Sequence, residues 1–180
     1  MIKTIIFDSG GVIVDSSALL NLFVAVFQPK NVDKFWKEIA KSVGMSDNKK
    51  IPKDLWTKHY ERLAKIDKDV LVIVSKLKKN YKTALISNTI EPHAKINKRL
   101  GLFDNFDVVV LSYEVQMTKD EQSIFLFTVK KLGVKPEECV FIDDIQKFVD
   151  TAKSFGMKGI LFKNAEQLKK ELADLGVKID

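Results

Sequence analysis

A chain of 180 residues, of which 46% are apolar and 30% charged, can bury one core and a small appended unit, and this composition excludes a disordered protein. The formal net charge is +6, but only Arg62 and Arg99 of the 30 basic residues are arginine and the lysines are scattered, so we expect no nucleic-acid partner. The single cysteine, Cys139, excludes an intrachain disulfide, and no apolar segment reaches the length of about 18 residues that a membrane span needs, so we expect a cytoplasmic protein with no membrane partner.

Five short apolar segments are predicted to form the strands of one sheet. Most positions in each segment are apolar, which is typical of parallel strands that are covered on both faces. Helical patterns that end at a glycine lie between the later segments. This alternation predicts an α/β fold with a doubly wound, Rossmann-like parallel sheet. The predicted strands are residues 3–8, 82–87, 107–112, 139–143 and 158–162, and the predicted helices between them are residues 92–100, 120–132 and 146–155.

The connection after the first predicted strand is much longer than a βα loop, which usually has about 2 to 6 residues. Asp67 is predicted to be the N-cap of the helix that enters the second strand, so this helix belongs to the core. The remainder of the connection has the pattern of three further helices, residues 17–27, 33–43 and 52–66. We therefore expect two domains, namely an α/β core formed by residues 1–15 and 67–180 and a small helical cap formed by residues 16–66.

Polar side chains follow the predicted strands at the points where the strands end. Each of them alone has an ordinary explanation as a helix cap or a turn residue. However, ligands of an open parallel sheet bind where loops leave the carboxyl ends of its strands, and here four strands in succession supply polar groups at these ends. We therefore expect one shared site. The residues are Asp8, Ser87, Asn88, Lys119, Asp143 and Asp144.

The chemistry of these residue types indicates phosphoryl transfer. Three carboxylates at one point repel one another unless a cation lies between them, and a hard divalent ion such as Mg²⁺ is bound by carboxylates together with phosphate oxygens. Lys119 would balance further negative charge, and the Ser87 hydroxyl could hold phosphate oxygens. Asp8 could then attack phosphorus and form an aspartyl phosphate that water hydrolyses.

Four segments resemble, in order, the motifs of the haloacid dehalogenase-like hydrolase superfamily, in its branch with a helical cap. The segments are "IIFDSGGVIVD", "ALISNT", "LSYEVQMTK" and "EECVFIDD". The resemblance implies that the strand ending at Asp143 lies beside the strand ending at Asp8. It implies that Asp8 is the nucleophile, that Lys119 is catalytic and binds phosphate, and that Ser87 and Asn88 bind phosphate.

The resemblance also implies a Mg²⁺ cofactor and a small phosphorylated metabolite as the partner, acted on by a monomer or homodimer. The implied metal ligands are the side chains of Asp8, Asp143 and Asp144 and the main-chain carbonyl of Gly10.

Three positions depart from the family pattern. Gly10 stands where most phosphatases of the family have a second aspartate that protonates the leaving oxygen, and loss of a general acid/base costs about 10² to 10⁴ in rate, so we expect weak activity. Asp120 stands where the family usually has proline after its lysine, and Phe148 replaces the usual asparagine of the last motif's helix.

Three interpretations stay open on the sequence. The first is a Mg²⁺-dependent phosphatase of a small phosphate monoester such as a sugar phosphate. The second is a catalytically impaired relative that acts as a binding protein. The third is a metal-independent haloacid dehalogenase; however, those relatives have an aromatic residue at the position of Gly10 and lack the acid pair that this chain keeps at Asp143 and Asp144.

Overall fold

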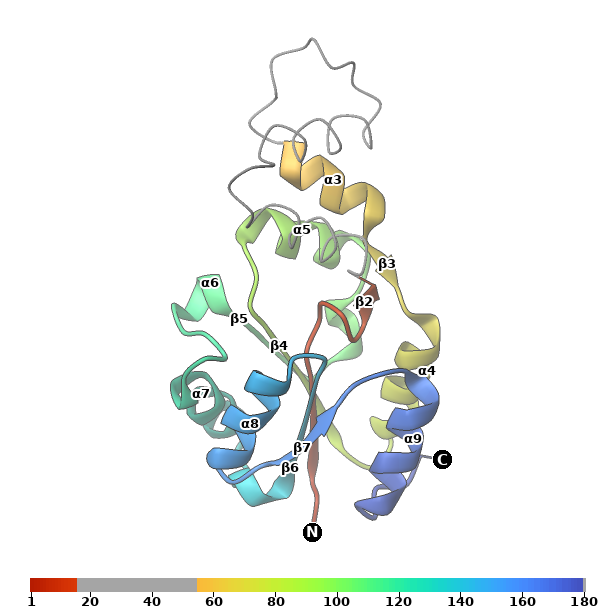
Figure 1. Ribbon diagram of the computed structural model, residues 1–180, viewed down its shortest axis with the longest axis vertical. Coiled ribbons are helices and arrows are strands. Elements are labelled where there is room, and N and C mark those ends of the chain that lie inside the picture. The colour runs from red at the N-terminus through yellow and green to blue at the C-terminus, as the bar shows by residue number, and fades with distance from the viewer. Residues whose placement is uncertain (16–54, 180) are drawn as a thin grey trace. The chain divides into compact units, whose positions relative to one another are not determined.

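The computed structural model describes residues 1–15 and 55–179 and divides the chain into two compact units (Figure 1). Unit 1 comprises Met1–Val14 and Ile66–Asp180, and unit 2 comprises Asp15–Lys65. The helices predicted over residues 17–27 and 33–43 lie outside the described residues, and helix α3 (Leu55–Leu63) is the described part of the third. The helical cap over residues 16–66 therefore stays a prediction.

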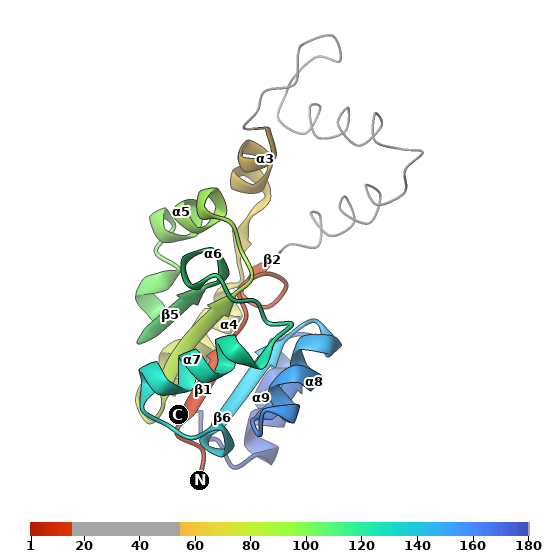
Figure 2. The ribbon, with the colours of Figure 1, turned by 90° about the vertical axis from the view of Figure 1, so that its left-hand side faces the viewer.

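Unit 1 is built on a parallel five-stranded sheet, which confirms the predicted α/β fold class. The sheet order is β5-β4-β1-β6-β7, so β1 is the central strand and lies between β4 and β6 (Figure 2). The strands are β1 (Thr4–Phe7), β4 (Lys82–Ser87), β5 (Val108–Leu111), β6 (Cys139–Asp143) and β7 (Lys158–Leu161). Two shorter strands, β2 (Val14–Asp15) and β3 (Lys65–Ile66), form a separate two-stranded sheet.

Helices cover both faces of the five-stranded sheet, with α7 and α8 on one face and α4 and α9 on the other (Figure 1). This double cover explains why β1 and β6 are buried at every position. The helices of unit 1 are α4 (Lys68–Leu77), α5 (Glu91–Arg99), α6 (Ser112–Val115), α7 (Gln122–Leu132), α8 (Gln146–Ser154) and α9 (Ala165–Asp174), with 3₁₀ turns at Phe103–Asn105 and Pro136–Glu138. In the described parts of the chain, no helix is long and apolar enough to cross a membrane.

A local signal decides where helix α4 begins. The predicted N-cap Asp67 is confirmed, because its carboxylate accepts hydrogen bonds from the main-chain N–H groups of Asp69 at 2.9 Å and Val70 at 3.1 Å. Helix α7 begins at Gln122 rather than at residue 120, because Glu121 is extended (φ −121°, ψ 149°). Lys119 therefore lies in the turn before the helix and not in the helix itself.

An apolar cluster beneath α7 and α8 fixes these two helices on the sheet. Phe125 of α7 meets Phe141 of β6 edge to face, with ring centroids 5.1 Å apart, and stacks on Phe155 at 6.4 Å. Phe148 of α8 is half-buried against the same cluster. The position of α8 relative to the start of α7 is thus set by packed aromatic side chains.

Candidate active site

Asp8, Lys119 and Asp143 meet at the carboxyl ends of the central strands. In the register of the sheet, Phe7 lies beside Ile142, so the residues that follow these two, Asp8 and Asp143, leave neighbouring strands at the same level. Lys119 Nζ donates to Asp8 Oδ1 and to Asp143 Oδ2, both at 2.6 Å. All three side chains are almost fully buried, with 2% of the lysine side chain exposed. A buried ammonium with two carboxylates is costly to assemble and marks a candidate functional site.

Asp144 completes an acidic cluster with Asp8 and Asp143. One carboxylate oxygen from each of the three lies within 4.8 Å of the others. Burial, followed by the charge of Asp8, raises the pKa of the Asp143 carboxyl to about 7 and raises the pKa of Asp144. Within the described residues, the buried Oδ1 of Asp144 has no hydrogen-bond partner. These oxygen donors, with one oxygen left unpaired, fit a hard divalent cation such as Mg²⁺.

Gly11 allows the acidic cluster to close. Its φ of +84° lies in the left-handed region, and a β-carbon at this position would be 2.1 Å from Asp144 Oδ2. Any other residue would push the carboxylate away or move the loop after β1. The family resemblance gives a role to Gly10 and none to Gly11, although the pair of glycines in the loop after the first strand is the signal that could have identified both.

Lys119 is held by its main chain as well as by its ammonium group. Its N–H donates to Asn88 Oδ1 at 3.0 Å, which ties the turn before α7 to the residue that follows β4. Burial alone would lower the pKa of the Lys119 ammonium, but the charges of Asp8 and Asp143 together outweigh that effect and raise it. The lysine is therefore a fixed positive charge at the site.

The remaining predicted site residues lie at or just after the ends of β4 and β1. Ser87 is the last residue of β4 and is buried, and Asn88 follows it. Gly10 lies in the loop after β1, which is closed by hydrogen bonds from the N–H groups of Ile13 and Val14 to the Ser9 carbonyl. The phosphate contacts of Ser87 and Asn88 and the metal contact of the Gly10 carbonyl stay predictions.

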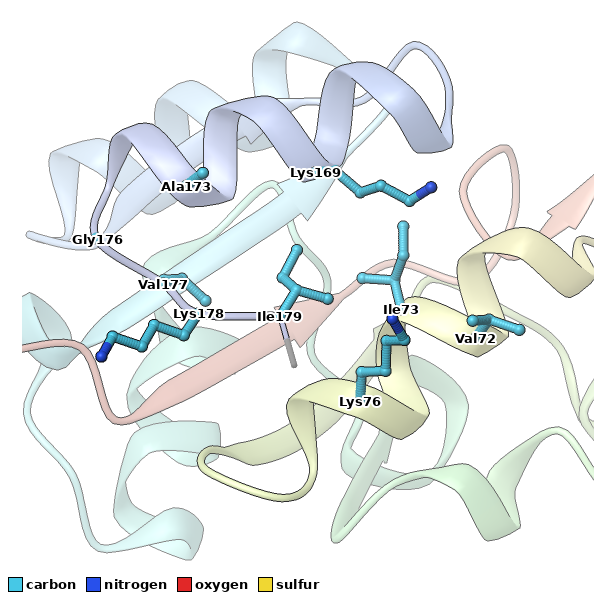
Figure 3. Close-up of a pocket in the computed structure, with 9 residues that line it drawn as sticks. All are labelled: Val72, Ile73, Lys76, Lys169, Ala173, Gly176, Val177, Lys178 and Ile179. Carbon is cyan, nitrogen blue, oxygen red and sulfur yellow. The ribbon is translucent and has the colours of Figure 1, made fainter.

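A separate cavity of about 590 Å³ lies between α4, α9 and residues 176–179 (Figure 3). Apolar side chains and three lysines line it, namely Lys76, Lys169 and Lys178, and none of the acidic cluster does. The groups that can perform hydrolysis lie at the strand ends and not in this cavity.

Comparisons with known proteins identify the family of the chain. A family model described as haloacid dehalogenase-like hydrolase matches residues 30–156. D-ribitol-5-phosphate phosphatase of Bacteroides thetaiotaomicron is 28% identical, with 96% of this chain and 97% of that protein covered. Flavin mononucleotide hydrolase 1 of Arabidopsis thaliana is 43% identical, but the match covers only 34% of this chain and 25% of that protein.

A solved structure has the same fold as this chain. A HAD family enzyme of Bacteroides thetaiotaomicron, in complex with magnesium and inorganic phosphate, superposes with a TM-score of 0.68 at 22% identity, covering 91% of this chain and 95% of that one. At this identity the likeness establishes the fold.

Proposed function

Because the chain belongs to the haloacid dehalogenase-like hydrolase family, we propose that it is a Mg²⁺-dependent phosphatase of a small phosphate monoester, such as a sugar phosphate. The observation that carries the proposal is the buried cluster in which Lys119 bonds both Asp8 and Asp143, with Asp144 beside them. The similarity along the whole chain to a D-ribitol-5-phosphate phosphatase supports the substrate class.

Asp8 is the proposed nucleophile. Lys119 holds its Oδ1, so the other carboxylate oxygen attacks the phosphorus, and the bond from phosphorus to the alcohol oxygen breaks. Water then attacks the phosphorus of the aspartyl phosphate, which releases inorganic phosphate and restores the Asp8 carboxylate. Gly10 offers no acid to the leaving oxygen, so that oxygen takes its proton from water, and turnover is slow.

The other residues neutralise and orient the phosphoryl group. Lys119 supplies a fixed positive charge, and the Ser87 hydroxyl and the Asn88 amide bind phosphate oxygens in this proposal. The proposed Mg²⁺ ligands are the side chains of Asp8, Asp143 and Asp144 and the Gly10 carbonyl. A bound Mg²⁺ would reduce the repulsion between the phosphate and the three carboxylates.

The test is hydrolysis of an activated aryl phosphate with Mg²⁺, followed by a panel of sugar and nucleotide phosphates. We expect measurable turnover that Asp8→Asn abolishes, because an amide cannot form the aspartyl phosphate. Asp174→Asn, an exposed position on α9, is the matched control and is expected to keep full activity.

Two results would contradict the proposal, each in favour of one alternative. If neither the natural chain nor Asp8→Asn hydrolyses any substrate of the panel, a binding protein would be favoured. Release of chloride from a 2-chloro acid without metal would favour a dehalogenase, although a metal-free mechanism gives no role to the unpaired oxygen of Asp144.

A further inference from the structure

The Lys119 ammonium has an aromatic ring as its third neighbour. An ammonium group has three N–H donors, and two of them are used by Asp8 and Asp143. The Phe148 ring lies against the same group, with Lys119 Nζ 4.6 Å from the ring centroid. This distance lies within the range of about 6 Å in which the face of an aromatic ring attracts a cation.

A second contact joins the same two segments. Lys147, the neighbour of Phe148 in α8, forms an ion pair with Asp120, the neighbour of Lys119 in the turn before α7. Two consecutive residues of α8 thus hold two consecutive residues of this turn. The ion pair is exposed, with 69% of the lysine and 44% of the aspartate side chain accessible, so its energy is small. The contact with the ring involves the buried Lys119 ammonium, where water screens the attraction less.

Asp120 and Phe148 are also positions where the chain departs from the family pattern. In that pattern the two positions are usually proline and asparagine. Here the ion pair and the ring face take these places, so the two departures form one arrangement around Lys119. This explains how the lysine keeps its position although both usual neighbours are replaced.

We propose that Phe148 is a positioning residue, whose ring face holds the Lys119 ammonium against Asp8 and Asp143. The ring also keeps water from the third side of the ammonium group, which strengthens the two bonds to the carboxylates. The catalytic consequence rests on the proposed function, whereas the contact itself can be measured without any activity.

The first test is a double-mutant cycle on stability in metal-free protein. Phe148→Leu and Lys119→Met are made singly and together, and the unfolding equilibrium constants are measured with denaturant. We expect a coupling of about tenfold, or about 1.4 kcal/mol. Phe155→Leu is the matched control, because Phe155 is also half-buried on the same cluster but has its ring on Phe125. Equal coupling for both phenylalanines, or none for Phe148, would overturn the proposal.

The second test nearly keeps the shape of the side chain and mainly changes the charge distribution of its ring. Successive fluorination of the Phe148 ring withdraws electrons from its face, and we expect stability to fall with each fluorine. The same series at Phe155 is expected to show no such trend. This test does not depend on the folding of Lys119→Met. If the Phe148 ring only fills space, stability will not change with the number of fluorines at either Phe148 or Phe155.

The third test concerns turnover. If the chain is a phosphatase, Phe148→Leu lowers kcat about tenfold with KM unchanged, and Phe148→Tyr, which keeps the ring, restores it. A rise in KM without loss of kcat would contradict the positioning role. If no activity is found, the proposed function fails, and the two stability tests still decide the role of Phe148.

Discussion

Gly11 and Asp144 lie so close together that a side chain at position 11 would collide with the Asp144 carboxylate where it now lies. The 2.1 Å separation between a β-carbon there and Asp144 Oδ2 is far inside van der Waals contact. Glycine at this position is thus a requirement of the acidic cluster as well as of the turn.

Gly11→Ala is expected to destabilise the fold and to weaken Mg²⁺ binding. The left-handed φ alone costs about 1 kcal/mol, and the clash with Asp144 adds to it. Gly133→Ala is the matched control, because Gly133 has φ +68° with nothing within 4 Å of the added carbon. Denaturant unfolding and calorimetric titration with Mg²⁺ measure the two effects. Equal losses of stability for both variants, with unchanged Mg²⁺ affinity, would show that the contact with Asp144 is unimportant.

Gly10→Asp is expected to raise turnover. It places a carboxyl where the family usually has its acid/base, a group that contributes about 10² to 10⁴ in rate. Gly10→Asn, which has the same shape without the acid, is the control and is expected to leave turnover unchanged. Steady-state hydrolysis of a phosphate ester with a poor leaving group is the measurement. If both variants bind Mg²⁺ and neither is faster than the natural chain, then the missing acid does not limit the rate.

His93 makes stability depend on pH. Burial lowers its pKa from 6.5 to about 4, so the native state stays neutral while the unfolded chain takes up a proton. The contribution of this pKa difference to the free energy of unfolding is fully present above pH 6.5 and is lost as the pH falls toward 4. His93→Gln is expected to flatten this part of the curve of unfolding free energy against pH. If the curves of unfolding free energy against pH run parallel for the variant and the natural chain between pH 7 and 5, His93 is not the source of the pH dependence.

Cys139 is expected to be unreactive in the folded protein. Burial, and then the charges of Glu138 and Glu137, raise the pKa of the thiol to about 12. The thiol is therefore almost entirely protonated at pH 8, and the sulfur is fully enclosed at the start of β6. Ellman's reagent is expected to label one thiol in denaturant and none in buffer. Rapid labelling of Cys139 in protein whose circular dichroism spectrum is that of the native state would contradict the prediction.

The sequence predicts the sheet well because each of its strands has a local signature. The continuous apolar segments and the caps at helix ends depend on neighbouring residues, and the N-cap at Asp67, where α4 begins, is of this kind. Helix α9 was not predicted, although Asn164 caps it by accepting a hydrogen bond from the Gln167 N–H, and Leu168 and Leu172 are buried one turn apart.

The details of the site were less predictable, because they depend on contacts between distant segments. That Asp8 and Asp143 meet follows from the order of the strands, which the family resemblance supplied. The contact of Lys119 with Phe148 and the closeness of Gly11 to Asp144 depend on how α8 and the loop after β1 are placed in space. No pattern of neighbouring residues in the sequence predicts distances between such distant segments.

The central place of β1 has a consequence for biosynthesis. β1 is translated before the other strands of its sheet and hydrogen-bonds to β4 and β6, and β6 begins only at Cys139. One edge of β1 therefore stays open until most of the chain has been translated, and an open apolar edge is prone to pair with other chains. The bond between Lys119 and Asp8, which are 111 positions apart, must likewise wait for this late pairing. We expect nascent chains that end before β6 to depend on chaperones to prevent aggregation.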